Sequence, residues 1–367
     1  MKNLIVAASL FLAHSVITTS ASTQQPLHDL DTSFTSSLIS LHKSLVEIPS
    51  ISGAERNVSS FLIEYMKSKN FTVKSQAVSE TRENVLAYSG RSLKTRTLVT
   101  SHIDTVPPFW PYERHGDEIW GRGTVDAKGS VASQIIAVES LLQSSEISEG
   151  DVGLLFVVGE ERGGEGMRVV NDLGLSWDTV IFGEPTELKL ASGHKGGMGF
   201  TLKAKGKAGH SGYPELGKSA THMLIQALAA LDGLTLPSSE RFGNTTINIG
   251  KLEGGVAANV IAEDASAVVS IRVAAGNAKE ISELVEKTIH DAVPDIQIDF
   301  TLGIGPVAID HDVDGFETAV MNYGTDIPAL KGDHKRYLYG PGTILVASID
   351  FTLGIGPVAI DHDVDGE

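Results

Sequence analysis

Three short apolar runs, each followed by acidic or histidine side chains, constrain the fold of this chain more than any other feature. The runs are residues 98–99, 154–158 and 179–182. Apolar, β-branched runs are typical of strands that are buried on both faces of a parallel sheet. The carboxyl ends of such strands meet at one edge, which is where open α/β sheets bind their ligands. The side chains that follow the three runs are His102 with Asp104, Glu160 with Glu161, and Glu184.

The side chains at this predicted edge indicate a metal site. Asp126 joins them, because it lies on the loop that opens the next predicted helix, whose apolar residues recur at helical spacing from Val131 to Leu142. Carboxylates that lie close together raise one another's pKa unless a cation neutralises them. Nitrogen and oxygen donors together suit zinc. A buried histidine such as His102 is by itself more often structural, so the hypothesis depends on the whole group.

These positions resemble the motifs of the M20 metallopeptidase family, which includes glutamate carboxypeptidase, aminoacylase-1 and the succinyl-diaminopimelate desuccinylases. The likeness extends from about residue 35 to about residue 347 and is strongest to secreted fungal carboxypeptidases of the family. It implies an α/β fold, in which a zinc-exopeptidase-like catalytic domain carries an inserted ferredoxin-like α+β domain for a lid or for dimerisation. The residues that carry the likeness are His102-Ile-Asp104, Gly123-Thr-Val-Asp126-Ala-Lys-Gly129, Gly159-Glu160-Glu161 and Gly183-Glu184-Pro185.

The resemblance also implies a role for each of these acids. His102, Asp126, Glu161 and Glu184 would hold two zinc ions, with Asp126 as the carboxylate that bridges them. Glu160 would be the general base toward a metal-activated water, and a base must stay off the metal to take a proton. An alternative interpretation of Asp126 is a helix N-cap, which is compatible with a metal role.

Four further residues receive roles. Asp104 lies two residues after His102 on the same side of the strand and is interpreted as the partner that holds the ligand imidazole. By resemblance, His210 polarises the substrate carbonyl and stabilises the oxyanion. Asn259 and Arg272 match positions that bind a substrate carboxylate, a task that suits a guanidinium fork. The alternatives are an ordinary loop residue for His210 and an ordinary strand-end cation for Arg272.

The N-terminus predicts export. Residues 1–21 have a basic start at Lys2, an apolar stretch from Leu4 to Ala13 and a small-residue exit, which together are typical of a secretory signal. In a secreted chain, three Asn-X-Ser/Thr tripeptides become glycosylation acceptors. Their asparagines are Asn57, Asn70 and Asn244.

The pattern of apolar residues changes near residue 194 and predicts the domain organisation. The catalytic domain would comprise residues 22–193 and 305–367, and the inserted domain residues 194–304. Helices are predicted over 34–48 and 58–69, and strands over 72–76, 84–88 and 97–101. In the insertion, a strand (198–205), a helix (218–231), two strands (245–252 and 265–273), a helix (278–291) and a strand (296–302) follow the order of a ferredoxin-like unit.

Charge and composition limit the partners. The formal net charge of the 367 residues is −17, which argues against nucleic acid and anionic membrane surfaces. No stretch after the signal is long and apolar enough to span a bilayer. The chain has no cysteine, which excludes disulfides and thiol catalysis.

The C-terminal part departs from the family pattern. Residues 298–315 recur without change at 349–366. The second copy follows a predicted apolar strand over residues 340–347. Relatives carry their last metal-binding histidine directly after that strand, and this chain has Ser348 there. A serine does not replace an imidazole, so we expect weakened metal binding and little activity.

The sequence therefore predicts a secreted zinc hydrolase that cleaves an amide bond next to a free carboxylate, with a peptide as its substrate. An amidohydrolase of the same family, acting on an N-acyl amino acid, is one alternative. Ser348 favours a second alternative, a non-catalytic protein that binds peptides or metal. Relatives often form homodimers through the inserted domain, which makes a homodimer the expected assembly, without nucleic acid or membrane partners.

Overall fold

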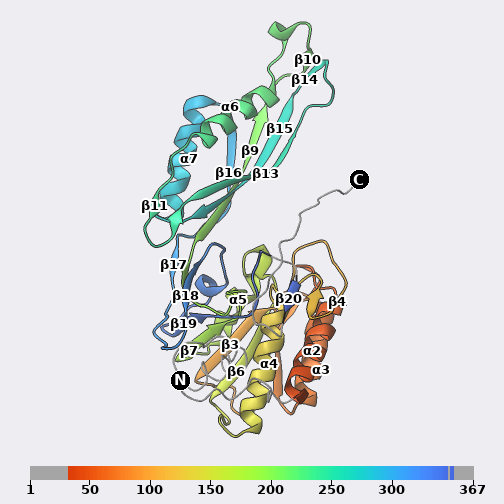
Figure 1. Ribbon diagram of the computed structural model, residues 1–367. Helices are drawn as coiled ribbons and strands as arrows, with labels where there is room; N and C mark the ends of the chain where they lie inside the picture. The colour runs from red at the N-terminus through yellow and green to blue at the C-terminus, as the bar shows by residue number, and fades with distance from the viewer. Residues whose placement is uncertain (1–31, 346–347, 351–367) are drawn as a thin grey trace. The chain divides into compact units, whose positions relative to one another are not determined.

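The three apolar runs form neighbouring strands of a six-stranded sheet (Figure 1). Strand β3 (Thr97–His102) lies between β6 (Val152–Val157) and β7 (Thr179–Phe182) and is parallel to both. Every residue of these three strands is buried. This burial on both faces explains why the sequence shows continuous apolar runs in place of an alternating pattern. The carboxyl ends of the strands share one edge, as predicted.

The structure is a computed structural model that describes residues 32–345 and 348–350. The chain divides into two units. Unit 1 holds the six-stranded sheet and comprises the described residues up to Ser192, then Ile309–Ala319 and the residues from Thr325 onward. Unit 2 comprises Gly193–Ala308 and Val320–Gly324.

The outer strands of the sheet in unit 1 have mixed directions. On one side, β1 (Thr72–Ala77) and β2 (Glu83–Tyr88) extend it with antiparallel pairing next to β6. On the other side, β19 (Lys335–Leu338) pairs in parallel with β7 and is contributed by the chain after unit 2. The strand order is β1-β2-β6-β3-β7-β19.

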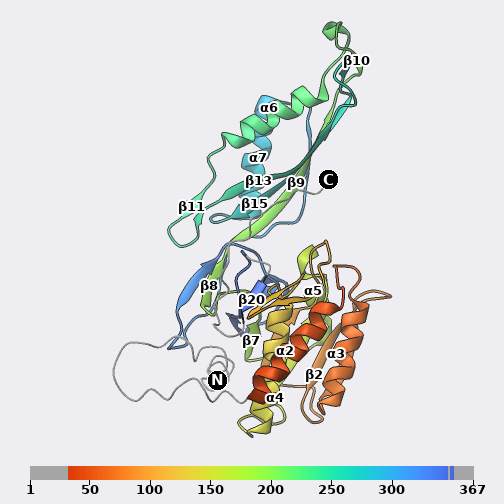
Figure 2. The same ribbon diagram turned by 45° about the vertical axis from the view of Figure 1, so that its right-hand side comes forward.

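Three helices share one apolar core with this sheet (Figure 2). They are α2 (Thr32–Glu47), α3 (Arg56–Ser68) and α4 (Lys128–Gln143). The periodic apolar residues that predict α2 include Leu41 and Leu45, and both are buried. Pro49 ends the helical pattern shortly after Glu47, because proline lacks a backbone donor.

A buried lysine connects two of these helices. Lys128, the first residue of α4, is 1% exposed. Its ammonium donates hydrogen bonds to the carbonyl oxygens of Leu45 and Ile48, at 2.9 and 2.8 Å, at the end of α2. The Leu45 carbonyl also accepts the N–H of Ile48, which lies just beyond the helix, at 3.3 Å. Burial lowers the pKa of Lys128 to about 7.

Unit 2 has the predicted β-α-β-β-α-β order. Its elements are β9 (Gly196–Lys205), α6 (Ala220–Asp232), β13 (Thr246–Gly254), β15 (Asp264–Val273), α7 (Ala278–Ala292) and β16 (Gln297–Phe300). The four strands form an antiparallel sheet in the order β13-β15-β9-β16, as in ferredoxin-like units. Alternate residues of β15 are buried with the apolar faces of α6 and α7 in the core of this unit.

The helix starts in unit 2 are capped by local side chains. The Ser219 hydroxyl accepts the N–H of His222 at the start of α6. Asn277 and Glu280 form a reciprocal capping box at the start of α7. These caps explain why both helices begin where their apolar periodicity begins.

Shorter elements complete the described chain. The strands are β4 (Glu113–His115), β5 (Glu118–Trp120), β8 (Leu190–His194), β10 (Gly209–His210), β11 (Ser238–Ser239), β12 (Gly243–Asn244), β14 (Val260–Ile261), β17 (Val307–Ala308), β18 (Thr318–Met321) and β20 (Ser348–Asp350). The short helices are η2 (Glu160–Arg162), α5 (Glu165–Val170), η3 (Asn171–Leu173), η4 (Pro214–Leu216) and η5 (Ile327–Ala329).

The strand predicted over residues 340–347 is wrong for the described part of that range. Residues 340–345 form a turn, in which only Thr343 makes an isolated bridge, to Thr186. Gly340, Pro341 and Gly342 explain the difference, because Gly342 has a φ of 77° and proline has no N–H for a ladder. The strand that does pair with β7 lies earlier, at β19.

Within residues 32–345 and 348–350, no helix combines the length and the apolar character that crossing a membrane requires.

The pH dependence of folding follows from His42, which is fully buried in α2 with its Nε2 2.8 Å from the Thr124 carbonyl oxygen. Burial lowers its pKa from 6.5 to about 4. Between these values the unfolded chain binds a proton that the folded chain does not, so stability is full above pH 6.5 and falls as the pH drops toward 4. We expect His42 to account for about 3 kcal/mol of this loss at pH 4.

Urea unfolding between pH 7.5 and pH 4 measures this effect. His42→Gln, which keeps a donor for Thr124, should flatten the decline of the unfolding free energy, whereas the exposed His222→Gln should not. Equal declines in the wild type and His42→Gln would contradict the assignment.

Candidate metal centre

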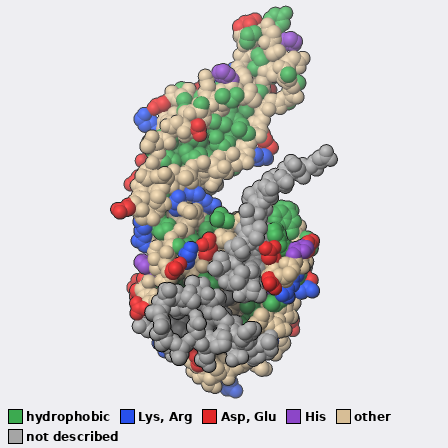
Figure 3. All heavy atoms as spheres, in the orientation of Figure 1, with side chains coloured by type: hydrophobic (Ala, Val, Ile, Leu, Met, Phe, Trp, Pro, Cys, Tyr) green, Lys and Arg blue, Asp and Glu red, His purple; other side chains and the backbone are tan. Residues whose placement is uncertain are grey.

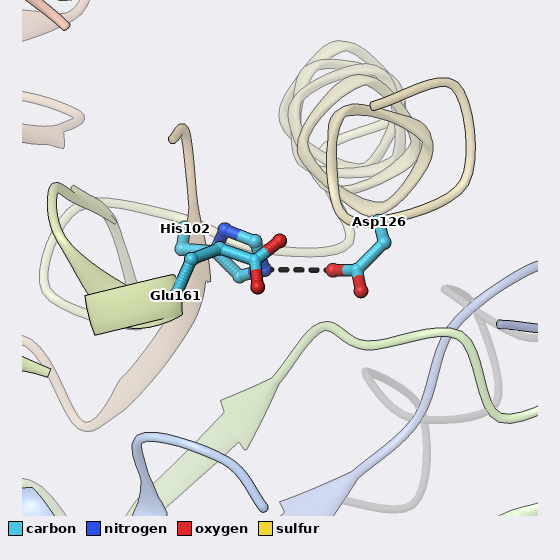
Figure 4. Close-up of side chains that lie close together, drawn as sticks. All are labelled: His102, Asp126 and Glu161. Carbon is cyan, nitrogen blue, oxygen red and sulfur yellow. Dashed lines mark hydrogen bonds and ion pairs between the residues drawn. The ribbon is translucent and has the colours of Figure 1, made fainter. Parts of the chain in front are cut away.

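Three of the predicted ligands lie together at the carboxyl edge of the sheet (Figure 4). His102 is the last residue of β3, Asp126 precedes α4, and Glu161 lies in η2 directly after β6. One ligand atom of each lies within 4.8 Å of those of the other two. The His102 Nε2 is 2.9 Å from the Asp126 Oδ1 and 3.8 Å from the Glu184 Oε1. The structure therefore gathers the other three predicted metal ligands around the imidazole of His102.

The electrostatics of this cluster favour the binding of a cation. Burial raises the pKa of Glu184 well above its usual value, and the charges of Asp126 and Glu160 add to the effect. Burial and the charge of Asp126 raise the pKa of Glu161 to about 7. For His102, burial opposes protonation, yet the neighbouring acids, with Glu184 first, raise its pKa well above 6.5. A divalent cation would replace these protons, and the donor set of one imidazole and several carboxylates fits zinc.

Asp104 fixes the backbone that carries Glu160 and Glu161. Its side chain is fully buried, and its two carboxylate oxygens accept the backbone N–H groups of Glu160 and Glu161 at 3.0 and 3.2 Å. The Ser52 hydroxyl donates to it at 2.7 Å. Burial alone would raise the pKa of Asp104, but the nearby His102 and these donors lower it. Asp104 is thus a permanent anion that fixes the turn carrying both glutamates.

The contact between Asp104 and the imidazole differs in detail from the expectation. The Nδ1 of His102 is 3.0 Å from the backbone carbonyl oxygen of Asp104 and 3.5 Å from its carboxylate. A carbonyl only accepts hydrogen bonds, so Nδ1 carries the hydrogen. In that arrangement Nε2, which faces Asp126, is the nitrogen that a metal would use.

The turn at η2 gives the adjacent residues Glu160 and Glu161 different surroundings. Gly159, with a φ of 75°, and Gly163, with a φ of 95°, flank η2 in left-handed conformations that glycine adopts without strain. Among the described residues, the ligand group contains Glu161 and not Glu160. The glycines around Glu160-Glu161 were thus a signal for a sharp turn at the strand end.

Asp126 does not cap the following helix. Helix α4 begins at Lys128, and Ala127 occupies the N-cap position without a side-chain hydrogen bond. The N-cap interpretation of Asp126 is therefore wrong, because its carboxylate faces His102 instead.

Asp326 is an acid of this region that sequence reasoning missed. It lies at the start of η5 and is 6% exposed. Burial raises its pKa to about 7, and its charge acts on Glu160 and Glu184. No apolar run precedes it, so nothing in the sequence marked it as a neighbour of residues that lie more than a hundred positions earlier.

The remaining predicted residues belong to unit 2. His210 in β10 is exposed, and the carbonyl of exposed Asn259 accepts the N–H of Ser211 at 3.0 Å. Arg272 is exposed near the far end of β15. The eight residue steps from Asp264 to Arg272 span about 26 Å along an extended strand. Within one chain, the structure brings His210 and Asn259 together, but Arg272 lies at the other end of β15.

Comparison with known proteins agrees with this architecture. Residues 192–297 match the peptidase dimerisation domain family M20_dimer. An M20 domain-containing peptidase of Sordaria macrospora is 49% identical over 364 residues, covering 87% of this chain and 80% of the relative. A probable carboxypeptidase of Aspergillus clavatus is 46% identical over 345 residues, covering 85% and 83%.

Solved structures share the fold at lower identity. An M20 family metallo-carboxypeptidase from Sulfolobus solfataricus has a TM-score of 0.70 and 17% identity, covering 86% of this chain and 95% of that one. The di-peptidase Dug1p from Saccharomyces cerevisiae has a TM-score of 0.71 and 16% identity, with 96% of each chain covered. These structures show the fold, and the identity to the fungal relatives makes the protein a hydrolase. The chain belongs to the M20 peptidase family.

Metal binding tests the consequence of Ser348, the first residue of β20, which pairs with Trp120 of β5. We expect the wild type to keep fewer than two zinc ions per chain after dialysis against metal-free buffer. Ser348→His restores an imidazole where the resemblance places one, and should raise the affinity for the second ion at least about tenfold.

Zinc content by mass spectrometry and competition with a chromophoric chelator give both quantities. The exposed Ser79→His controls for an added histidine elsewhere and should leave the content unchanged. Two tightly held zinc ions in the wild type would refute the prediction.

Proposed function

We propose that this chain is a zinc-dependent carboxypeptidase that hydrolyses the amide bond next to a free carboxylate. The observation that carries the proposal is the convergence of His102, Asp126, Glu161 and Glu184 at the end of three buried strands, with Glu160 beside them. The names of the fungal relatives, probable carboxypeptidases, support the choice of substrate class.

Zinc bound at these residues would supply Lewis-acid activation of a water and of the scissile carbonyl. The chain's own contribution is the proton transfer. Glu160 is held next to the ligands by its N–H bond to Asp104. Burial and the charges of Asp326 and Asp126 raise its pKa well above 4.5. A carboxyl with a raised pKa can take the proton of the water and return it to the leaving amine near neutral pH.

The roles of unit 2 in this proposal are to bind the substrate and to form a homodimer. His210 would polarise the carbonyl, and Asn259 and Arg272 would bind the carboxylate. Because Arg272 is at the opposite end of β15 from the other two, one copy does not supply all three residues to one substrate. A second copy would, and sedimentation equilibrium of the purified chain tests for it.

The surface of unit 2 supports an assembly of this kind. Strand β13 is an edge strand of its sheet, with nearly all residues exposed. Apolar side chains also lie on the surface of this unit (Figure 3), among them Ile225 at 62% and Leu252 at 59% exposure. Unpaired edges and exposed apolar groups of this kind mark protein interfaces.

The proposed carboxypeptidase function has two alternatives. An N-acyl-amino-acid amidohydrolase would use the same residues and differ only on the acyl side of the bond. A non-catalytic protein is favoured by a specific observation, the serine at position 348. Turnover of dipeptides and N-acetyl amino acids separates the three.

Hydrolysis should depend on Glu160. We expect slow turnover of dipeptides by the zinc-loaded wild type and faster turnover by Ser348→His, measured by release of free amino acid. Adding Glu160→Gln to Ser348→His should lower the rate about 10²- to 10⁴-fold with the zinc content unchanged, because the proton acceptor is lost.

The exposed Glu146→Gln serves as the matched control. Absence of turnover in a fully zinc-loaded Ser348→His variant would decide for the non-catalytic alternative. Faster turnover of N-acetyl amino acids than of dipeptides would decide for the amidohydrolase.

We further propose that the chain is secreted and glycosylated. The signal-like residues 1–21 lie outside the described residues, and Asn57, Asn70 and Asn244 are all exposed. Expression of the full chain in a secreting eukaryotic host should yield medium protein that begins near residue 22 and loses mass on glycosidase treatment. Retention in the cell with Met1 intact would oppose the proposal.

A further inference from the structure

Arg122 is held in a fixed position beside the metal centre. Its guanidinium carbon lies 4.0 Å from the centre of the Trp110 ring, and its Nε donates to the Pro108 carbonyl oxygen at 3.0 Å. Its backbone N–H donates to the Trp110 carbonyl oxygen at 3.1 Å. Gly121 precedes it with a φ of 146°, and a Cβ there would lie 2.8 Å from Val46. A side chain at position 121 would therefore clash, so only glycine fits directly before Arg122.

The loop that supports Arg122 also contacts a metal ligand. Residues 106–110 carry three groups in sequence: the Val106 N–H bonds to the Glu161 carboxylate, the Pro108 carbonyl accepts Arg122 Nε, and the Trp110 ring faces the guanidinium. Arg122 itself lies four positions before Asp126. Arg122 thus lies on the same segment as one predicted ligand, Asp126, and the loop that supports it contacts another, Glu161.

The charge of Arg122 has no ion-pair partner among residues 32–345 and 348–350. No carboxylate there lies within 4.0 Å of its guanidinium nitrogens, although Glu161 and Asp126 are close enough for their charges to act on it. Partial burial lowers the pKa of Arg122, and those two charges only partly oppose the effect. A cation in the metal centre would neutralise the same two acids. Arg122 would then be a half-buried cation without a counter-charge.

We propose that Arg122 and Trp110 form a carboxylate-binding subsite in unit 1, next to the metal centre. The inference rests on the proposed hydrolase function and adds a carboxylate-binding group in unit 1 to Asn259 and Arg272 of unit 2. Of the five N–H donors of a guanidinium, Nε–H is used by Pro108 and the fork of the two terminal nitrogens remains for a carboxylate. The Trp110 indole, which is 44% exposed, packs against the guanidinium and offers an apolar surface to the rest of the ligand.

The carboxylate has two sources, the α-carboxylate at the end of a peptide or the side chain of an acidic residue. Three ligands distinguish them: N-acetylleucine carries only the α-carboxylate, N-acetylglutamic acid α-amide only the side-chain carboxylate, and N-acetylleucinamide neither. Isothermal titration of the zinc-loaded full chain measures the Kd of each. The subsite predicts that one of the two acids binds more tightly than the neutral amide.

Arg122→Met tests the assignment. It should weaken binding of the preferred acid about 10- to 100-fold and leave the neutral amide and the zinc content unchanged, with Arg122→Lys in between. Arg114→Met is the matched control, since Arg114 is an exposed arginine whose Nε also donates to a backbone carbonyl, that of Gly116. It should have no effect on either Kd.

Two results would overturn the subsite. An equal loss of acid and amide binding would mean that Arg122 only supports the loop, and an unchanged Kd for both acids would mean that it touches neither. Because these readouts are binding constants, they are separate from turnover. Absence of hydrolysis in Ser348→His would remove the proposed function, whereas a selective effect of Arg122→Met would still establish the subsite.

Discussion

The buried carboxylate of Asp104 is the interaction on which the rest of the site depends. It joins two segments that are distant in sequence, the turn at Ser52 and the turn after β6 that carries Glu160 and Glu161, while the backbone carbonyl of Asp104 contacts His102 at the end of β3. A buried charge is tolerated only when hydrogen bonds replace its hydration. Because Asp104 needs all these donors, it fixes the distance between the imidazole and the acids independently of any metal.

A second buried charge system holds the same turn from its other side. Arg82 donates to both carboxylate oxygens of Glu55 at 2.7 Å and also pairs with Glu165 at the start of α5. A Cβ at Gly159 would lie 2.7 Å from the Arg82 guanidinium, so the turn is packed against this pair. Buried ion pairs add little net stability, but they specify geometry. Asp104 therefore holds the backbone N–H groups of the turn that carries Glu160 and Glu161. The Arg82 ion pairs pack against Gly159 in the same turn.

The sequence best predicted those elements whose buried apolar residues form a continuous run or recur at regular spacing. The continuous apolar runs predicted strands β3, β6 and β7. In unit 2, the succession of strand-like segments and segments with helical spacing of apolar residues predicted the fold. Strand β19 was not predicted, because only two of its four residues, Tyr337 and Leu338, are buried and its first two are basic. The neighbouring range 340–345 was apolar enough to suggest a strand, yet its glycines and proline exclude a ladder. Asp326 had no local signal, because only the return of the chain after unit 2 places it near the acids.

The donor set also limits which cation the site can prefer. His102 is the single nitrogen donor in the candidate ligand group of the described residues, and every other donor is a carboxylate oxygen. Imidazole suits zinc, whereas carboxylates serve harder ions such as manganese and magnesium equally well. Because the resemblance places a second imidazole where this chain has Ser348, we expect a loss of selectivity for zinc as well as of affinity. The tautomer imposed by the Asp104 carbonyl then gains importance, since it directs the one available nitrogen lone pair toward Asp126 and away from the protein interior.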